Sequence, residues 1–403
     1  MKRILIFSLA YYPRFVSGAE VAIKEITDRI SPEEIEFHLI TLRFDAALPR
    51  EERIGNVIVH RIGFSKKDLS FGDLRRFPLK LLKPWYQLFA VWHAIRLHRE
   101  YHFDGTWAMM AHSAGVPAVL FKMCYPRVPY LLTLQEGDPP EYIERRLRPV
   151  WFLFKRAFTE ADVLQTISTF LLDWGRKMGF AGYAEVIPNG VDAPHFAHVL
   201  RIDRVGAIRA EIGKGGGETW LIHTGRLAYK NGLDVAIRAL PLLPEQIHFF
   251  MIGDGHEKDL LIELSHELGV SYRAHFHPYV PNEVLPDYLH ACDIFIRPSR
   301  SEGMGNSFIE AMAAGLPVIA TQEGGIADFL FDAKRNPDKP TTGWAVDVDS
   351  PEQIATAVQD ILARPDQVAR VTATARALVV EKYDWNLIGK NMKSVFDRLL
   401  EKR

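Results

Sequence analysis

Two glutamates and two glycines near position 300 are the residues of this chain best suited to chemistry. Glu302 and Glu310 flank a loop with Gly303 and Gly305, just before a segment with helical periodicity. Free backbone N–H groups and the positive end of the helix dipole make such a helix start suitable for an anion, and phosphate is the natural example. Two carboxylates would repel a phosphate unless ligand hydroxyls lie between them. The pattern therefore predicts a ligand with phosphate and sugar groups.

The residues around these glutamates predict a strand, a loop, a helix and a second strand of a parallel sheet. The apolar run 294–296 has the character of a buried strand, helical periodicity extends from about 307 to 314, and 318–320 has the character of the next strand. Ligands of such sheets bind beyond the carboxyl ends of the strands. The alternative is that both acids are solvated charges at a helix start, where acids are favoured in any case. The glycine-rich loop and the sheet context favour a ligand.

A pair of cations follows another predicted strand. Arg226 and Lys230 come directly after the apolar run 220–224 and Gly225, before a helix expected over 233–240. A guanidinium fork and an ammonium point charge can converge on one diphosphate, although exposed basic side chains are more often solvent charges. We therefore expect this loop to bind phosphate.

The sequence from Glu302 to Ala320 resembles the Glu-x7-Glu region of the family-4 retaining glycosyltransferases with the GT-B fold, also called glycosyl transferases group 1. Residues 225–227 and the region of Lys230 resemble further elements of that family, and the likeness is thinner over 1–188. The resemblance implies an α/β fold of two Rossmann-like, doubly wound domains facing a central cleft. It also implies a C-terminal helix that crosses back to the N-terminal domain.

The resemblance assigns roles to particular residues. Glu302 would lie against the donor sugar, Glu310 would hold the ribose hydroxyls of the nucleotide, and the backbone of 303–307 would bind sugar and phosphate oxygens. His112, which follows a strand expected over 105–111, resembles the family's cleft histidine, which contacts the donor sugar; a histidine standing alone is more often structural. The residues expected in catalysis are Glu302, His112, Arg226 and Lys230. The residues expected to bind the donor are Gly18, Gly225, Arg226, Lys230, Gly253, Tyr279, Val280, Glu302, Gly303, Met304, Gly305, Asn306, Ser307 and Glu310.

Two stretches depart from the family's pattern. Gly18 is a single glycine where related enzymes often have two, and the loop 135–140 has no histidine where they often carry one. In that loop Glu136 and Asp138 are weak candidates for acceptor contact or for a general base. Gly253 begins a Gly-x-Gly that is by itself weak evidence for a nucleotide site, but the resemblance implies that it lines the nucleotide pocket.

At 403 residues the chain is long for one hydrophobic core, and its length predicts two domains. We expect an N-terminal, acceptor-binding Rossmann-like domain over 1–193 and a C-terminal, donor-binding Rossmann-like domain over 194–380. Residues 381–403 are expected to form the helix that packs back on the N-terminal domain.

Composition and charge exclude several classes of protein. Hydrophobic residues make up 48% and charged residues 25% of the chain, and the net charge of −1 does not suggest nucleic-acid binding. The two cysteines have no metal-like spacing, and we expect neither a metal ion nor a cofactor. No apolar run reaches the roughly 18 residues of a membrane span. The apolar start is interpreted as a first buried strand rather than a signal peptide, so we expect a cytoplasmic protein.

Two segments combine basic and aromatic residues. Between residues 66 and 99, six aromatic residues alternate with eight lysines and arginines, and 145–156 has a similar composition. Basic and aromatic residues on an amphipathic helix suit an anionic membrane surface. The alternative is an ordinary helix with a solvated basic face. If the first interpretation holds, the protein is peripheral at the inner face of the membrane and its acceptor is lipid-linked.

The resemblance, taken with these features, implies a hexosyltransferase-type enzyme that moves a sugar from a nucleotide diphosphate sugar to an acceptor hydroxyl, with retention and without a metal ion. The expected acceptor is a glycan or lipid-linked glycan in cell-surface polysaccharide or glycolipid synthesis, and the donor base is left open among UDP, GDP and ADP. A nucleotide-sugar epimerase of similar architecture and a non-catalytic nucleotide-sugar-binding subunit are the alternatives. Turnover that depends on an acceptor would distinguish the transferase from both.

Overall fold

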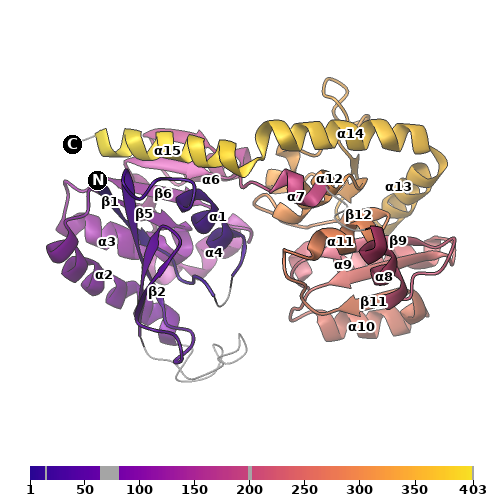
Figure 1. Ribbon diagram of the computed structural model, residues 1–403, viewed down its shortest axis with the longest axis horizontal. Helices are drawn as coiled ribbons and strands as arrows, with labels where there is room; N and C mark the ends of the chain where they lie inside the picture. The colour runs from indigo at the N-terminus through magenta and orange to yellow at the C-terminus, as the bar shows by residue number, and fades with distance from the viewer. Residues whose placement is uncertain (14–15, 64–80, 198–201, 402–403) are drawn as a thin grey trace. The chain divides into compact units, whose positions relative to one another are not determined.

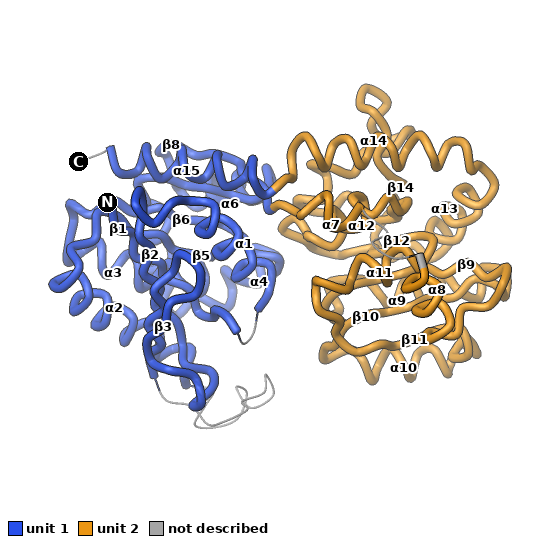
Figure 2. The backbone as a smooth tube through the Cα atoms, in the orientation of Figure 1, with its two compact units in different colours: residues 1–189, 385–403 blue, residues 190–384 orange. Residues whose placement is uncertain are grey.

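The computed structural model describes residues 1–13, 16–63, 81–197 and 202–401, and the chain divides into two compact units. The first unit comprises 1–189 and 385–403, and the second comprises 190–384 (Figure 2). The sequence predicts this division after residue 193 and the start of the returning segment at 381, so the observed boundaries differ by four residues each. Each unit contains one largely parallel sheet with helices on both faces, so the fold is α/β with two Rossmann-like domains (Figure 1).

The first unit is built on an eight-stranded sheet in the order β3-β4-β2-β1-β5-β6-β7-β8. Neighbouring strands are parallel except for the antiparallel pair β3 and β4. The strands are β1 (Lys2–Phe7), β2 (Ile35–Leu42), β3 (Glu51–Ile54), β4 (Val57–Ile62), β5 (Gly105–Met109), β6 (Tyr130–Leu134), β7 (Val163–Thr166) and β8 (Tyr183–Val186). The inner strands are apolar on both faces because helices cover both.

Helices cover both faces of this sheet. They are α1 (Gly18–Thr27), α2 (Leu82–Tyr101), α3 (Val116–Cys124), α4 (Pro140–Arg146), α5 (Trp151–Thr159), α6 (Thr169–Lys177) and α15 (Trp385–Glu401), with a short π-helix η3 (Ala111–Gly115) and a 3-10 turn η4 (Arg148–Val150). On β1, Ile4 and Ile6 join the core shared with α1 and α15, whereas Phe7 contacts Phe121 of α3 with ring centroids 6.2 Å apart. Helix α3 in turn packs against α2 and α5.

The C-terminal helix α15 belongs to the first unit although the second unit precedes it in the chain (Figure 2). Trp385, Ile388 and Phe396 are buried in the core of the first unit. The ring centroid of Phe396 is 5.5 Å from that of Phe37 and 5.2 Å from that of Trp107. The closing helix therefore crosses back to the N-terminal domain, as expected.

The second unit is built on a six-stranded parallel sheet in the order β11-β10-β9-β12-β13-β14. The strands are β9 (Thr219–Thr224), β10 (Ile247–Ile252), β11 (Ala274–His277), β12 (Ile294–Arg297), β13 (Val318–Ala320) and β14 (Trp344–Ala345). The strand order reverses between β9 and β12, which is the position where sheets of this type bind ligands. The loops that follow β9, β10, β11 and β12 all meet at the carboxyl edge of this sheet.

Two helical layers enclose the second sheet. The helices are α7 (Ala193–Ala197), α8 (Ile202–Glu211), α9 (Leu233–Ala239), α10 (Lys258–Glu267), α11 (Leu285–Ala291), α12 (Asn306–Ala314), α13 (Pro351–Ala363) and α14 (Pro365–Lys382), and the 3-10 turns are η5 (Tyr229–Asn231), η6 (Leu240–Leu242), η7 (Ser271–Arg273) and η8 (Gly324–Asp328). Helix α9 packs against α10 and α13, and α12 packs against α7, α11 and α14. Along β12, Ile294 and Ile296 join the core with α9 and α13, whereas Phe295 contacts Phe308 of α12 with centroids 5.6 Å apart.

Candidate active site

The loop between β12 and α12 is shaped by a glycine that no other residue could replace without strain. Gly305 caps the start of α12 with a φ of +87°, and a Cβ atom there would lie 2.6 Å from the ring of Phe308. The loop can therefore turn directly into the helix while Gly303 and Met304 stay buried. The sequence predicts that the helix begins at about Ser307, whereas it begins one residue earlier, at Asn306.

Glu302 is a buried carboxylate, and each of its two oxygens has a protein partner. Its side chain is 8% exposed, its Oε1 atom accepts a hydrogen bond of 3.0 Å from the Gly303 N–H, and its Oε2 atom is paired with the guanidinium of Arg297. Burial raises the pKa of Glu302, but Arg297, Lys230 and backbone N–H groups outweigh burial and leave the pKa below its usual value. Glu302 is therefore ionised at neutral pH and held in one orientation.

Glu310, on α12, is in a different state. It is half-buried, and within the described part of the chain its carboxylate makes no hydrogen bond or ion pair. Burial raises its pKa to about 7, and the nearby charge of Arg297 only partly offsets that effect. A ligand with hydroxyl groups would stabilise such a carboxylate, because the hydroxyls would donate the hydrogen bonds that the described residues do not provide.

The loop between β9 and α9 carries the two predicted cations. Arg226 is exposed, and Lys230 is half-buried in the turn η5. Lys230 is close enough to Glu302 to lower the pKa of its carboxyl. The Asn231 Nδ2 atom donates a hydrogen bond of 2.5 Å to the Arg226 carbonyl, which closes the loop on itself. The loop therefore presents cations at the same edge of the sheet as Glu302.

Gly225, in the loop after β9, and Gly253, in the loop after β10, bring these two loops into direct contact. The Gly225 N–H donates a hydrogen bond of 2.9 Å to the Ile252 carbonyl, and Gly253 has a φ of +138°. A Cβ atom at Gly253 would lie 2.0 Å from the Gly225 carbonyl oxygen. The packing of these two loops is therefore enough to explain why residue 253 is a glycine. The expected contact between Gly253 and the nucleotide is not needed for that explanation.

Tyr279 and Val280 follow β11, and the sequence pattern of 275–280 predicts a strand that reaches Val280. Strand β11 ends at His277, whereas the prediction extended it to Val280. Tyr279 is 74% exposed and Val280 is buried. Partial burial of the hydroxyl raises the pKa of Tyr279, and the negative charges of Glu283 and Glu310 raise it further.

The remaining predicted site residues, His112 and Gly18, belong to the first unit. The predicted strand 105–111 ends at Met109, and Ala111 already belongs to the π-helix η3, which contains His112. Met110 adopts a φ of +69°, and such strained residues and π-helical turns often occur at functional sites. Gly18 is the exposed first residue of α1.

A buried carboxylate holds His112 in place. The His112 Nδ1 atom lies 3.4 Å from Oε1 of Glu136, which also accepts the His112 backbone N–H at 3.3 Å, and Oε2 of Glu136 accepts the Gln135 N–H at 2.9 Å. Glu136 is 2% exposed. A group buried this deeply supports its neighbour rather than contacting an acceptor.

Sequence reasoning missed two residues of this site, Arg297 and Asn231. Both are buried, and the Arg297 Nη2 atom donates a hydrogen bond of 2.8 Å to Oδ1 of Asn231. The available signal was a charged residue that closes an otherwise apolar strand, since Arg297 follows Ile294–Phe295–Ile296.

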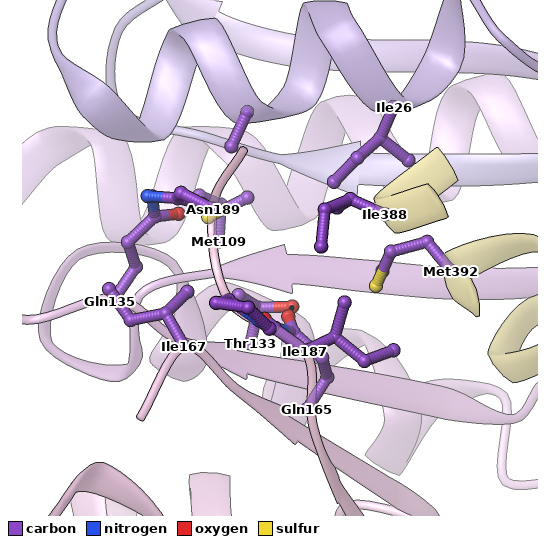
Figure 3. Close-up of a pocket in the computed structure, with 12 residues that line it drawn as sticks. Ile26, Met109, Thr133, Gln135, Gln165, Ile167, Ile187, Asn189, Ile388 and Met392 are labelled. Atoms are coloured by element: carbon purple, nitrogen blue, oxygen red, sulfur yellow. Dashed lines mark hydrogen bonds between the residues drawn. The ribbon is translucent and has the colours of Figure 1, made fainter. Parts of the chain in front are cut away.

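A small cavity in the first unit is not a ligand site. Its volume of about 10 Å³ is enough for one water molecule. Figure 3 shows Gln135, Gln165 and Asn189 with apolar residues of α15 around it, and the Gln165 Nε2 atom donates a hydrogen bond of 2.6 Å to the Ile187 carbonyl. Among the described residues the side-chain amide of Gln135 has no hydrogen-bond partner, so a water molecule would satisfy it.

Within the described ranges, no group of three or more histidine, cysteine or acidic side chains is placed to hold a metal ion. The one Asp-x-Asp sequence in this part of the fold, at Asp347 and Asp349, is paired with cations. Asp347 lies 2.8 Å from Arg335, and Asp349 lies 2.6 Å from Arg300.

Two surfaces of the first unit expose aromatic side chains beside basic ones. Helix α2 exposes Trp85, Leu88 and Trp92; the part of the predicted basic segment at 66–80 lies outside the described residues. The segment from α4 to α5 exposes Trp151 and Phe152 together with Arg145, Arg146 and Arg148. No helix in the described part of the chain is long and apolar enough to span a membrane.

Two family models match this chain, one over most of each unit. The model described as Glycosyltransferase Family 4 matches residues 16–194, and the model described as Glycosyl transferases group 1 matches residues 205–378. Together they cover most of the sequence.

Individual proteins resemble the chain at moderate identity. It is 28% identical to a GDP-mannose-dependent alpha-(1-6)-phosphatidylinositol monomannoside mannosyltransferase of Mycolicibacterium smegmatis, over 62% of this chain and 65% of that protein. Among solved structures, sucrose-phosphate synthase from Thermosynechococcus elongatus matches all of both chains with a TM-score of 0.83 at 20% identity. HepE from Anabaena, in complex with UDP-glucose, matches 99% of this chain and 100% of its own with a TM-score of 0.77 at 20% identity.

Proposed function

The chain belongs to the family-4 glycosyltransferases with the GT-B fold, and on this premise we propose that it moves a sugar from a nucleotide diphosphate sugar to an acceptor hydroxyl. The observation that carries the proposal is the carboxylate of Glu310, which has no hydrogen-bond or ion-pair partner among the described residues. It lies on α12, which follows the glycine-rich loop, and the same unit carries the loop with two cations. Hydroxyl donors suit the carboxylate, and a diphosphate suits the helix start and the cations.

The names of the similar proteins support a nucleotide sugar as the donor but leave its base open. HepE was solved with UDP-glucose, whereas the mannosyltransferase uses GDP-mannose. Tyr279 is exposed and its pKa is influenced by the charge of Glu310, so we propose that its ring and Val280 border the base. Ribose hydroxyls would then reach Glu310.

The chemical barrier is the separation of an oxocarbenium-like sugar from a diphosphate leaving group. Arg226, Lys230 and the backbone N–H groups of 303–307 are proposed to stabilise the developing phosphate charge. Both oxygens of Glu302 already interact with Gly303 and Arg297. We therefore propose that Glu302 accepts hydrogen bonds from sugar hydroxyls in a fixed orientation and does not act as a nucleophile.

We propose retention by departure and attack on the same face of the sugar. The bond between the anomeric carbon and the diphosphate oxygen breaks, and the bond to the acceptor oxygen forms on the face that the leaving group vacates. The acceptor's proton passes to the departing phosphate oxygen, so no protein nucleophile and no metal ion is needed. In this scheme His112 is a catalytic group oriented by Glu136.

The acceptor is proposed to be a glycan or lipid-linked glycan reached at an anionic membrane surface, as in cell-surface polysaccharide or glycolipid synthesis. The exposed Trp151 and Phe152, with three exposed arginines at 145, 146 and 148, support such a contact. The proposed location is the cytoplasm, with peripheral attachment to the inner face of the membrane.

Thermal unfolding with UDP, GDP, ADP and their sugar conjugates, with and without EDTA, tests the donor site. A ligand at about 100 times its Kd should stabilise the protein by roughly 2.7 kcal/mol. We expect one nucleotide to raise the Tm, EDTA to leave the shift unchanged, and Glu310→Ala to abolish it. Glu263→Ala, which removes an exposed acid of α10, is the matched control and should keep the shift. The donor site is wrong if no nucleotide stabilises the protein or if Glu310→Ala binds as tightly as the wild type.

Turnover separates the transferase from its alternatives. A transferase should consume the donor faster when acceptor is added, an epimerase should convert the donor alone, and a binding subunit should do neither. The anomeric configuration of the product, read by NMR, tests retention, because an inverted product would rule out same-face transfer.

A further inference from the structure

Arg297 is a buried arginine at the end of β12 that contacts three segments of the proposed donor site. It is 8% exposed. Its Nη1 atom donates a hydrogen bond of 2.9 Å to Oγ of Ser307, and its Nη2 atom donates one of 2.8 Å to Oδ1 of Asn231 and also pairs with Oε2 of Glu302. One guanidinium thus joins the loop after β9, the loop after β12 and the first turn of α12.

The amide of Asn231 extends this connection to the cationic loop. Its Oδ1 atom accepts from Arg297, and its Nδ2 atom donates to the Arg226 carbonyl at 2.5 Å. Lys230 precedes Asn231 in the turn η5, and its carbonyl accepts the backbone N–H of Arg300 at 2.7 Å. The backbone that carries both cations is therefore tied to the loop that carries Glu302.

The same guanidinium determines how Glu302 can interact with a ligand. An ionised carboxylate offers about four acceptor positions. The N–H groups of Gly303 and Met304 and the guanidinium of Arg297 occupy three of them, which leaves room for roughly one hydroxyl. A rigid fork fixes the plane of the carboxylate in a way that the single charge of a lysine would not.

We propose that Arg297 is a positioning residue of the transfer reaction. Through Asn231 it holds Glu302 in a fixed position relative to the cationic loop. The carboxylate that would bind the sugar and the cations that would bind the diphosphate are then correctly placed before the donor binds. This inference rests on the proposed donor site and adds a residue to it. The competing explanation is that Arg297 only neutralises a buried acid so that the second unit can fold.

Hydrogen exchange of the ligand-free protein tests the alignment directly. We compare the wild type with Arg297→Met, Arg297→Lys and Asn231→Ala. The matched control is Arg273→Met, because Arg273 is also a buried arginine of the second unit but donates to the carbonyls of Leu240, Leu243 and Pro244, outside the site.

We expect amides in 226–231 and 302–305 to exchange at least about tenfold faster in Arg297→Met, and those in 226–231 to do so in Asn231→Ala. Arg297→Lys should give an intermediate result, because an ammonium cannot bond both partners in fork geometry. Arg273→Met should lower the Tm without this local pattern. Exchange within threefold of the wild type in both loops, for both Arg297→Met and Asn231→Ala, would overturn the proposal; should Arg297→Met not fold, Asn231→Ala alone decides it.

Kinetics of the same proteins then separate positioning from stability. In Arg297→Met we expect kcat to fall by at least about 100-fold while the Kd of the free nucleoside diphosphate rises by less than about tenfold. Equal losses of kcat in Arg297→Met and Arg273→Met would assign Arg297 to folding alone. If the wild type neither binds nor turns over a nucleotide sugar, the proposed function fails, whereas the exchange experiment still decides whether Arg297 aligns the two loops.

Discussion

In the first unit, Oε1 of Glu136 accepts the backbone N–H of His112 at 3.3 Å and lies 3.4 Å from the Nδ1 atom of the same histidine. Because the second carboxylate oxygen accepts the Gln135 N–H, one buried side chain fixes both the backbone and the ring. This pairing gives a proton on Nδ1 an acceptor and leaves Nε2 as the ring atom that can face a ligand.

Replacing Glu136 should therefore damage both stability and turnover. Glu136→Ala leaves two backbone N–H groups without their acceptor, and we expect a loss of about 1–3 kcal/mol of unfolding free energy together with a lower kcat. Glu136→Gln keeps one acceptor oxygen and should lie between the wild type and Glu136→Ala. Chemical denaturation and initial rates are the measurements. Glu141→Ala, an exposed acid at the start of α4, is the control, and an effect as large as that of Glu136→Ala would contradict this reading.

As pH rises and Glu310 ionises, the stability of the folded protein should fall while its affinity for the nucleotide increases. Burial raises its folded pKa to about 7, above the unfolded value, so the folded state binds the proton more tightly. The associated stability is fully present below about pH 4.5 and is lost as pH rises through about 7, by up to about 3 kcal/mol. Hydroxyl donors prefer the ionised form, so nucleotide affinity should increase over the same range of pH.

Melting curves from pH 5 to 9, with and without nucleotide, measure both effects. Glu310→Gln should flatten the pH dependence of the free protein and of the ligand-induced shift, whereas Glu263→Gln should keep both. A nucleotide shift that does not depend on pH in the wild type would separate Glu310 from ligand binding.

Three glycines of the second unit allow backbone strain to be separated from steric contact. Gly216 has open space around it and no positive φ, Gly213 has a φ of +78° in open space, and Gly305 has a φ of +87° with the ring of Phe308 in the way. Alanine should therefore be near neutral at 216, cost on the order of 1 kcal/mol at 213, and cost clearly more at 305. Urea denaturation gives the three values. Equal losses at 213 and 305 would mean that the loop after β12 relaxes around the added methyl group.

Local sequence was enough to predict most of the sheet but not its edges. The strands at 294–296 and 318–320 were found because continuous apolar runs mark strands that are buried on both faces. The edge strand β3 was missed, since its sequence Glu51-Glu52-Arg53 is charged and half exposed. Strand β11 was predicted to be too long because the apolar pattern continues past its end. The strand stops before Pro278, which lacks the N–H group needed for pairing.

Some residues of the candidate site could likewise be predicted from local sequence, whereas others depend on contacts between distant parts of the chain. The glycine loop and its two glutamates lie in one short run, so a sequence pattern could identify them, and their roles remain predictions. The contact between Arg297 and Asn231 joins residues 66 positions apart. It depends on β9 and β12 being neighbours in the sheet although they are not consecutive in the chain, and periodicity does not carry that information.

Membrane contact through α4 and α5 should depend on both aromatic and basic side chains. Trp151→Ser with Phe152→Ser removes apolar rings that could enter the interface, and Arg145→Glu with Arg146→Glu removes cations that would each contribute about 1 kcal/mol at an anionic surface. Each pair should weaken binding to phosphatidylglycerol-containing vesicles at least about tenfold in a sedimentation assay, and the wild type should bind less at high salt.

Leu260→Ser is the control for this surface, since Leu260 is exposed on α10 of the second unit, a helix whose own sequence contains no arginine. It should bind vesicles as the wild type does. Vesicles of phosphatidylcholine alone should bind all of the proteins weakly, because the arginines then have no anionic partner. If the wild type does not sediment with anionic vesicles, or if the paired variants sediment equally well, the exposed rings are ordinary surface residues and the acceptor need not be membrane-bound.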